Sequence, residues 1–189
     1  MTVFSARHTP PEITALDPVR DHLKIVQWVG EYEFPFETRR SLEFALFRTF
    51  AVPSISGLLV STGHFAGHGQ KRYDDTALII AEIAENGYDN ERGRAAIRRM
   101  NQIHARYDIA NEDFIYTLTT FIFEPIRWIE RYGWRPLVEK EKLAAFYMWR
   151  RVGQMMGIRS LPETYAAMEQ FNIEKITVYN TFQLYRHEI

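Results

Sequence analysis

The chain contains no cysteine among its 189 residues. This absence excludes disulfides, iron–sulfur clusters, thiolate zinc sites and cysteine nucleophiles. Charge of one sign is also missing, because 23 basic and 24 acidic side chains leave a net charge of −1. A general nucleic-acid binder is therefore disfavoured, since no basic field would attract phosphates. The sequence also has no phosphate-binding glycine loop, no dinucleotide-binding fingerprint, and no HExxH or GxSxG motif.

Long hydrophobic runs are absent as well. The longest stretch without Lys, Arg, Asp or Glu covers residues 49–70, and Pro53, four glycines and several hydroxyl residues interrupt it. That composition is too polar for a bilayer-spanning helix. Residues 1–11 show no basic segment followed by an apolar one, as a signal peptide would. These features predict a cytoplasmic protein without a transmembrane segment.

The composition that is present is typical of one folded domain. Hydrophobic residues make up 46% of the chain and charged residues 25%, which excludes intrinsic disorder. Aromatic residues are frequent, with 13 Phe, 10 Tyr and 4 Trp. They indicate either a large buried core or a pocket for a flat apolar ligand, and composition alone does not separate the two.

Helix start and stop signals divide nearly the whole chain into helices, and the alternation typical of β-strands is missing. We therefore expect an all-α fold: a single globular multi-helix domain over residues 17–189, preceded by an extension over residues 1–16. Helices are expected to start at Pro18 after an Asp17 N-cap, at Pro35, Pro53 and Lys71, after an Asp89 or Asn90 N-cap, after an Asn111 N-cap, and at Val138, Glu163 and Ile173.

Three further features refine this prediction. Gly63, Gly67 and Gly69 predict a flexible loop before the helix that starts at Lys71. The segment over residues 114–123 is apolar on nearly every side, which predicts a central buried helix. Pro125 is expected to bend that helix, because proline cannot donate to the carbonyl four residues earlier.

One candidate functional residue lies on the helix over residues 91–107. Ile97, Met100, His104 and Tyr107 are spaced three, four and three residues apart, so they share one face and His104 points inward. A hydrogen-bonded core histidine is the simpler interpretation. A metal or haem ligand is the alternative, since a neutral imidazole on a buried helix can bind iron. The nearby arginines would pair with haem propionates or form the solvated face: Arg94, Arg98, Arg99 and Arg106.

A second candidate cluster lies on the helix that starts at Lys71. Arg72 and Thr76 extend an apolar stripe, and Asp75 lies three residues after Arg72. An exposed Arg–Asp pair is one interpretation. The other places a cation, a hydroxyl and a carboxylate at a pocket rim, where they could orient dioxygen or move a proton. His64 and His68 are four residues apart, but the expected glycine loop and the lack of a nearby carboxylate disfavour a metal site there.

Four sequence segments resemble the mpaB/rubber-oxygenase catalytic-domain family: VPSISGLLVSTGHF, KRYDDTALIIAEIAENGYDN, RRMNQIHARYDIANEDFIYTLTTFIFEPIRWIERYGWRPL and EKLAAFYMWRRVGQMMGI. The family includes fungal mpaB-type oxygenases and rubber-cleaving latex-clearing proteins. The likeness covers residues 16–171 and is closest to uncharacterised bacterial, fungal and plant members.

The resemblance implies a globin-reminiscent helical bundle that holds a b-type haem and uses dioxygen to oxidise an apolar substrate, isoprenoid or lipid-like. His104 matches the proximal iron ligand, and Arg72 and Thr76 match residues of the distal pocket. The rubber-cleaving members have a lysine where this chain has Asp75. A carboxylate cannot replace that cation, so we consider Asp75 as a base for an allylic proton.

A second departure from the family is length, because its members continue with further helices beyond the position of Tyr185. Three interpretations stay open: a C-terminally truncated fragment, a homo-oligomer in which a partner completes the site, or a member without catalysis. The main alternative to a haem-dependent oxygenase is accordingly a non-catalytic helical module that binds an apolar ligand or a protein. A di-iron bundle is set aside, because paired Glu-x-x-His spacings are absent.

Overall fold

The computed structural model describes residues 10–185, except for the side chains of residues 64–68, 72 and 179–185. Every regular element in this range is a helix, which confirms the all-α prediction. The elements are α1 (Pro11–Thr14), α2 (His22–Trp28), the π-helical turn η1 (Val29–Glu33), α3 (Pro35–Thr49), α4 (Pro53–Ser61), α5 (His64–Asn86), α6 (Glu91–His104), α7 (Asn111–Tyr132), α8 (Glu139–Met155) and α9 (Tyr165–Tyr185).

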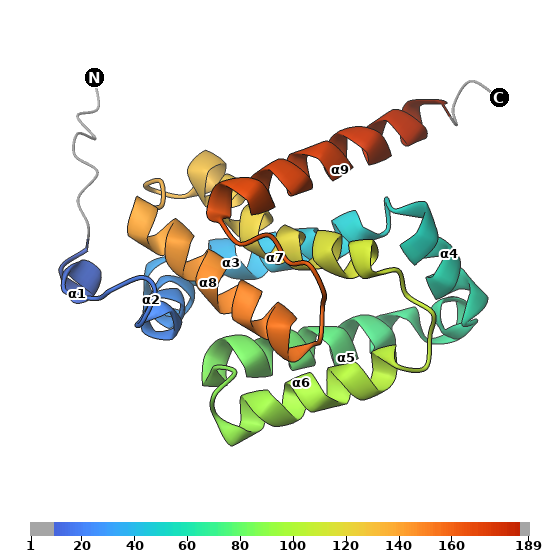
Figure 1. Ribbon diagram of the computed structural model, residues 1–189, viewed down its shortest axis with the longest axis horizontal. Coiled ribbons are helices and arrows are strands. Elements are labelled where there is room, and N and C mark those ends of the chain that lie inside the picture. Colours follow the sequence, from blue (N-terminus) through green and yellow to red (C-terminus); the bar gives the residue numbers. More distant parts are fainter. Residues whose placement is uncertain (1–9, 186–189) are drawn as a thin grey trace.

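Helix α7 is the centre of the fold, and α3, α8 and α9 pack against it (Figure 1). Its side chains are buried on almost every side, including Ile122 and Phe123, as the apolar segment predicts. The helix continues through Pro125 and ends before Gly133. Residues from both ends of the chain therefore share one hydrophobic core.

Helices α5 and α6 form an antiparallel pair at the lower edge of the molecule in Figure 1. Asn90 caps α6, since its side-chain oxygen accepts a hydrogen bond of 3.0 Å from the Arg92 backbone N–H. Gly87 ends α5 with φ of +75°, a conformation that favours glycine. Gly93 lies so close to Gly87 that a Cβ at Gly93 would overlap the Gly87 carbonyl oxygen. This tight turn fixes α6 against α5.

Helix α5 starts earlier than predicted. The expected glycine loop is wrong, because residues 64–70 are part of α5. Thr62 and Gly63 form the turn between α4 and α5, and Gly63 has a φ of +66°. Glycine costs only about 1 kcal/mol in a helix interior, so Gly67 and Gly69 do not interrupt a helix that continues through them.

The break predicted near Asn172 is also wrong, because α9 runs without interruption from Tyr165 to Tyr185. Asn172 is fully buried and donates a hydrogen bond of 2.8 Å to Thr119 on α7. Its oxygen accepts another of 2.8 Å from Arg127. Because α7 supplies hydrogen-bond partners for both the nitrogen and the oxygen of this amide, the side chain does not compete for the backbone groups of α9, and the helix continues.

Two predicted N-caps have other roles. Asp17 caps a turn, accepting hydrogen bonds of 2.9 Å from the backbone N–H groups of Val19 and Arg20, and α2 starts only at His22. Asn111 is the first residue of α7, and its amide makes two hydrogen bonds of 2.9 Å with the Arg159 backbone. The Asp17 side chain thus caps a short turn before α2, whereas the Asn111 side chain connects the start of α7 to the segment after α8.

Residues 10–16 pack against the body of the molecule. Ile13 is fully buried, and Lys140 on α8 donates hydrogen bonds of 3.1 and 2.6 Å to the carbonyls of Ile13 and Thr14. The described part of the expected N-terminal extension is therefore part of the folded domain.

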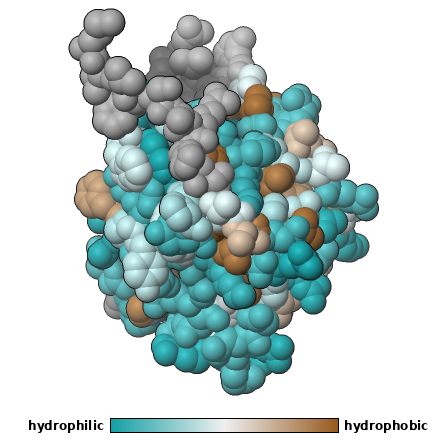
Figure 2. Space-filling model, turned by 90° about the vertical axis from the view of Figure 1, so that its left-hand side faces the viewer, coloured by the Kyte–Doolittle hydropathy of each residue, from teal (hydrophilic) through white to brown (hydrophobic). Residues whose placement is uncertain are grey.

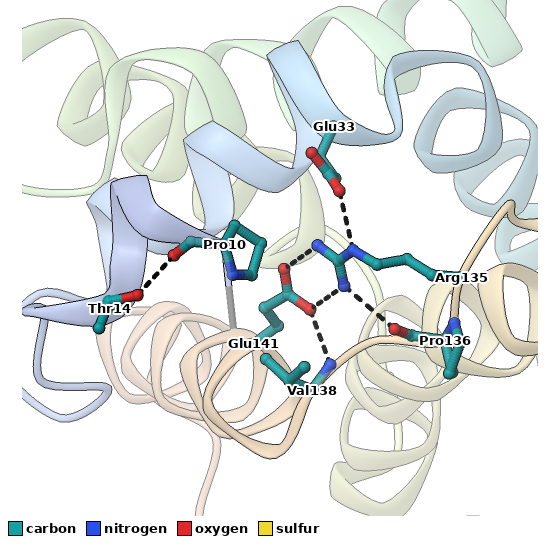
Figure 3. A network of polar contacts seen from close by, with 7 residues as sticks. All are labelled: Pro10, Thr14, Glu33, Arg135, Pro136, Val138 and Glu141. Carbon is teal, nitrogen blue, oxygen red and sulfur yellow. Dashed lines mark hydrogen bonds and ion pairs between the residues drawn. The ribbon is translucent and has the colours of Figure 1, made fainter. Parts of the chain in front are cut away.

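A buried ion-pair network joins η1 to the start of α8 (Figure 3). Arg135 donates two hydrogen bonds, of 2.8 and 2.9 Å, to the carboxylate of Glu141 and one of 2.8 Å to Glu33. The side chain of Glu141 is fully buried, and that of Arg135 is 14% exposed. Burial opposes the charge of Arg135, but the hydrogen bonds to Glu141 and Glu33 raise the pKa of the guanidinium.

The surface is mostly polar where Figure 2 shows it, with hydrophobic residues in separate small areas. Among the described residues, no single helix combines the length and hydropathy that crossing a bilayer needs. Helices α3 and α4 together meet both criteria, but they are bent by 84° at the break between them.

Candidate functional site

A cavity of about 500 Å³ lies between α4, α5, α6 and α7. This volume is within the range of small-molecule and cofactor sites. The wall is mainly apolar and is completed by the ends of α3 and α8 and by the loop after α6. We name it the His104 cavity, because His104 is its only lining histidine among the described side chains.

Helix α6 presents His104 to this cavity. Met100, His104 and Tyr107 all line it, and Ile97 is buried one turn earlier, which confirms the inward-facing stripe. Asn101 donates a hydrogen bond of 3.1 Å to the Met155 carbonyl. This bond attaches the last turn of α6, which contains His104, to the end of α8.

The ring of His104 packs edge-on against Phe114 of α7. Their centroids are 5.1 Å apart and their planes are inclined by 65°. An aromatic contact of this kind restricts the orientation of the imidazole. Phe114 also lines the cavity, so the same ring holds the histidine and forms part of the wall.

Helix α5 contributes hydroxyl groups to the same cavity. Thr76, Tyr73 and Ile80 line it, as expected for residues three and four positions apart. Burial and the nearby carboxylate of Glu43 raise the pKa of the Tyr73 hydroxyl, so this group stays protonated and can donate a hydrogen bond. Arg72 belongs to α5, but its side chain lies outside the described residues.

Asp75 does not contribute to the lining of this cavity. Its carboxylate is 56% exposed and pairs with Lys71, one turn earlier on α5. An exposed pair at this spacing is ordinary surface chemistry. The Arg72 side chain, the other proposed partner of Asp75, lies outside the described residues, and the role of Asp75 as a base stays a prediction.

The arginines of α6 lie on its solvated face. Arg98 is 58% exposed and forms an ion pair of 2.7 Å with Glu91, while Arg106 is exposed beyond the end of the helix. Neither lines the His104 cavity. Among the described side chains, no arginine or lysine lines this cavity, so the polar groups available there are hydroxyls, His104 and the carboxylates of Asp108 and Asp113.

The donor set suits a porphyrin better than a bare metal ion. Within the described residues no group of three His, Asp or Glu side chains could hold a metal. A haem brings four nitrogen ligands of its own and needs only one axial side chain, as His104 would supply. The wall around that histidine is mainly apolar, and no described arginine or lysine lines it to pair with haem propionates. The side chains of His64 and His68 lie outside the described residues.

Several cavity residues are absent from the sequence-based set. Tyr73 lies three positions before Thr76, so helical periodicity could have identified it. Asp113 is buried in the wall, at the start of α7. Trp149 comes from α8 and stacks on Phe121 with a centroid distance of 5.1 Å. No local pattern indicates this last contact, because the two residues come from different helices.

A second cavity, of about 670 Å³, lies next to the His104 cavity and shares five lining residues with it. Side chains of α2, η1, α3, α5, α7 and α8 line it. Residues common to both cavities form a shared wall: Leu46, Tyr73, Ile80, Phe121 and Trp149. Ile80 and Phe121 are almost completely buried, so the wall is part of the hydrophobic core.

Comparison with known proteins finds one matching family model. It is described as "ER-bound oxygenase mpaB/B'/Rubber oxygenase, catalytic domain" and matches residues 45–176. An ER-bound oxygenase mpaB of Penicillium roqueforti is 36% identical over 143 residues, which cover 72% of this chain and 48% of the relative. The ER-bound oxygenase mpaB of Penicillium brevicompactum is 38% identical over 163 residues, or 83% of this chain and 41% of the relative.

The ER-bound oxygenase mpaB' of Penicillium brevicompactum matches equally well, with 38% identity over 163 residues. This chain spans 38–48% of the length of these three relatives. No solved structure matches. The matched segment includes α4 to α8 in full and also all the residues that line the His104 cavity, from Leu46 to Ile158.

Proposed function

Since the chain belongs to the catalytic-domain family of ER-bound oxygenases mpaB/B' and rubber oxygenases, we propose that it is a haem b-dependent oxygenase acting with dioxygen on an apolar, isoprenoid or lipid-like substrate. The observation that supports this function best is the position of His104. It is an imidazole on a fixed helix at the edge of an apolar cavity of about 500 Å³.

Four lining residues have a specific role in this proposal. His104 would hold the haem through one ring nitrogen, with the contact to Phe114 setting the plane of the imidazole. When bound, the haem would supply an iron centre able to activate dioxygen. Thr76 and Tyr73 would donate hydrogen bonds to negative charge that develops on the oxidant. The apolar wall would exclude water and hold an alkene beside them.

Reconstitution with haemin tests the assignment of His104. We expect the wild-type chain to develop a sharp Soret band, and His104→Ala to lose it or to bind haemin more than about tenfold more weakly, because the axial ligand is removed. His22→Ala is the control, since His22 is bonded to Tyr88 and lies outside the cavity. An identical Soret band in wild type and His104→Ala would contradict the assignment.

The roles of Asp75 and Thr76 are separable by substitution. Because Asp75 is exposed and paired with Lys71, we expect Asp75→Asn to keep both haem binding and dioxygen consumption with an alkene substrate. Thr76→Val removes a cavity hydroxyl at nearly constant volume, so we expect slower oxidation by about tenfold or more with haem binding retained. A large loss of turnover in Asp75→Asn alone would instead support Asp75 as a proton acceptor.

The second candidate function is a non-catalytic module that binds an apolar ligand. The size of the two apolar cavities supports it, because binding without chemistry needs no more than these walls. Haemin reconstitution separates the two functions. A protein that develops no sharp Soret band when haemin is added, but that binds apolar ligands, is such a module.

A further inference from the structure

We propose that an aromatic surface on α3 and α7 is an interface at which two copies of this chain associate. Five exposed or partly exposed side chains make up this surface, which we name the aromatic strip: Phe36, Phe44, Phe47, Trp128 and Tyr132. None of them lines the His104 cavity or the second cavity. The association therefore concerns a separate part of the molecule and does not depend on the proposed oxygenase chemistry.

Contacts between neighbouring rings make the strip continuous across α3 and α7, which lie side by side (Figure 1). The centroid of the Phe44 ring lies 6.4 Å from that of Phe47 and 5.9 Å from that of Trp128. Trp128 in turn lies 4.9 Å from Tyr132, one turn later on α7. Phe36 is two turns before Phe44 on the same side of α3, because residues four positions apart are neighbours on a helix surface. The strip is thus one surface rather than five separate side chains.

The strip leaves a large aromatic area in contact with water. Phe36 and Phe47 are 67% and 69% exposed, and Tyr132 is 58% exposed. With the smaller contributions of Phe44 and Trp128, the strip presents about 500 Å² of aromatic surface, taking about 200 Å² for one fully exposed aromatic side chain. A patch of this size is among the largest that a monomer exposes. It is also more than half of the area, about 800 Å², that each partner buries in a standard stable interface.

The charges beside the strip are balanced. Three guanidinium groups lie 5.4 to 5.8 Å from ring centres of the strip: Arg40, Arg48 and Arg131. Three carboxylates come from the same two helices, next to Phe36, next to Phe44 and one turn before Trp128: Glu37, Glu43 and Glu124. Arg40 lies 2.9 Å from the carboxylate of Glu43, and Arg48 lies 3.3 Å from that of Glu124. The edge of the strip therefore combines both signs of charge in equal number.

This balance favours a second copy of the chain as the partner. In a two-fold interface the same surface faces itself, so a strip with charge of one sign would repel its own copy. Equal numbers of cations and anions avoid that repulsion, and the arginines of one copy can contact the rings of the other. A surface for anionic lipids or nucleic acid would need an excess of cations, which the described side chains beside the strip do not have. Phe, Tyr, Trp and Arg are also the residue types enriched in protein interfaces.

Sedimentation equilibrium of the haem-free chain tests the association. We expect the wild type to approach twice the mass of one chain as its concentration rises from about 5 to 200 µM. Phe47→Glu should weaken the association by about tenfold or more, because each copy would then bury a new charge against the rings of the other. Val60→Glu is the matched control and should associate like the wild type, since Val60 is 73% exposed but lies on α4, outside the strip.

A second variant places the same charge on the other helix of the strip. Tyr132→Glu changes an exposed residue at the end of α7 and should also weaken the association by about tenfold or more, so it decides if Phe47→Glu does not fold by circular dichroism. A wild-type chain that stays monomeric throughout would overturn the proposal. So would a dimer that neither variant weakens. A monomer that instead sediments with vesicles of phosphatidylcholine and phosphatidylserine would assign the strip to a lipid surface and overturn the proposal as well.

Discussion

Replacing Arg135 with methionine is expected to lower the free energy of unfolding by about 3–5 kcal/mol. Arg135 is the shared partner of Glu33 and Glu141 at the start of α8 (Figure 3). Glu141 is fully buried, and besides Arg135 it accepts only the Val138 backbone N–H among the described groups. Without the guanidinium, this carboxylate would be buried with one hydrogen bond left.

Urea denaturation followed by circular dichroism measures this effect. Arg98→Met is the matched control, because Arg98 forms an ion pair of similar length with Glu91 but on the surface. We expect its denaturation midpoint to stay unchanged within error, since exposed ion pairs contribute little. Arg135→Met with the same midpoint as Arg98→Met would show that the network adds no stability. Replacing Glu33, Arg135 and Glu141 together with apolar residues should recover part of the loss.

Gly93→Ala is the second substitution with a large expected effect, a loss of about 3 kcal/mol in the free energy of unfolding. The new Cβ would overlap the carbonyl oxygen of Gly87, and backbone atoms cannot move aside as a flexible side chain can. The turn between α5 and α6 would have to open. Because α6 carries His104, we expect haemin binding to weaken as well, although the variant residue does not line the cavity.

Gly57→Ala is the control for this prediction. Gly57 lies inside α4, and a Cβ there would have no neighbour within 4 Å. We expect this variant to be as stable as the wild type or more stable by about 0.5–1 kcal/mol, because alanine has the higher helix propensity. Thermal unfolding and haemin titration of the two variants are compared directly. The steric argument fails if Gly93→Ala is as stable as Gly57→Ala.

Helix class and helix positions follow largely from local sequence. Pro35, Pro53 and Gly133 mark helix boundaries that the structure confirms, because proline fixes φ and lacks a backbone N–H, while the conformational freedom of glycine makes it a poor helix former. The spacing of Met100 and His104 likewise fixes which side of α6 faces inward, since 3.6 residues per turn is a property of the helix alone. Family membership, too, is evident from short sequence segments.

Long-range packing decides the rest. Asparagine is common at helix ends, and the sequence predicts helix boundaries at Asn111 and next to Asn172. In the structure their side-chain amides instead form hydrogen bonds with residues 48 and 53 positions away. No local pattern encodes such a partner. The exposure of Asp75 and the contribution of Trp149 to both cavities likewise depend on how α5 and α8 pack. A cavity forms where helices distant in the sequence leave space between them, so its lining and its charge exist only in the assembled fold.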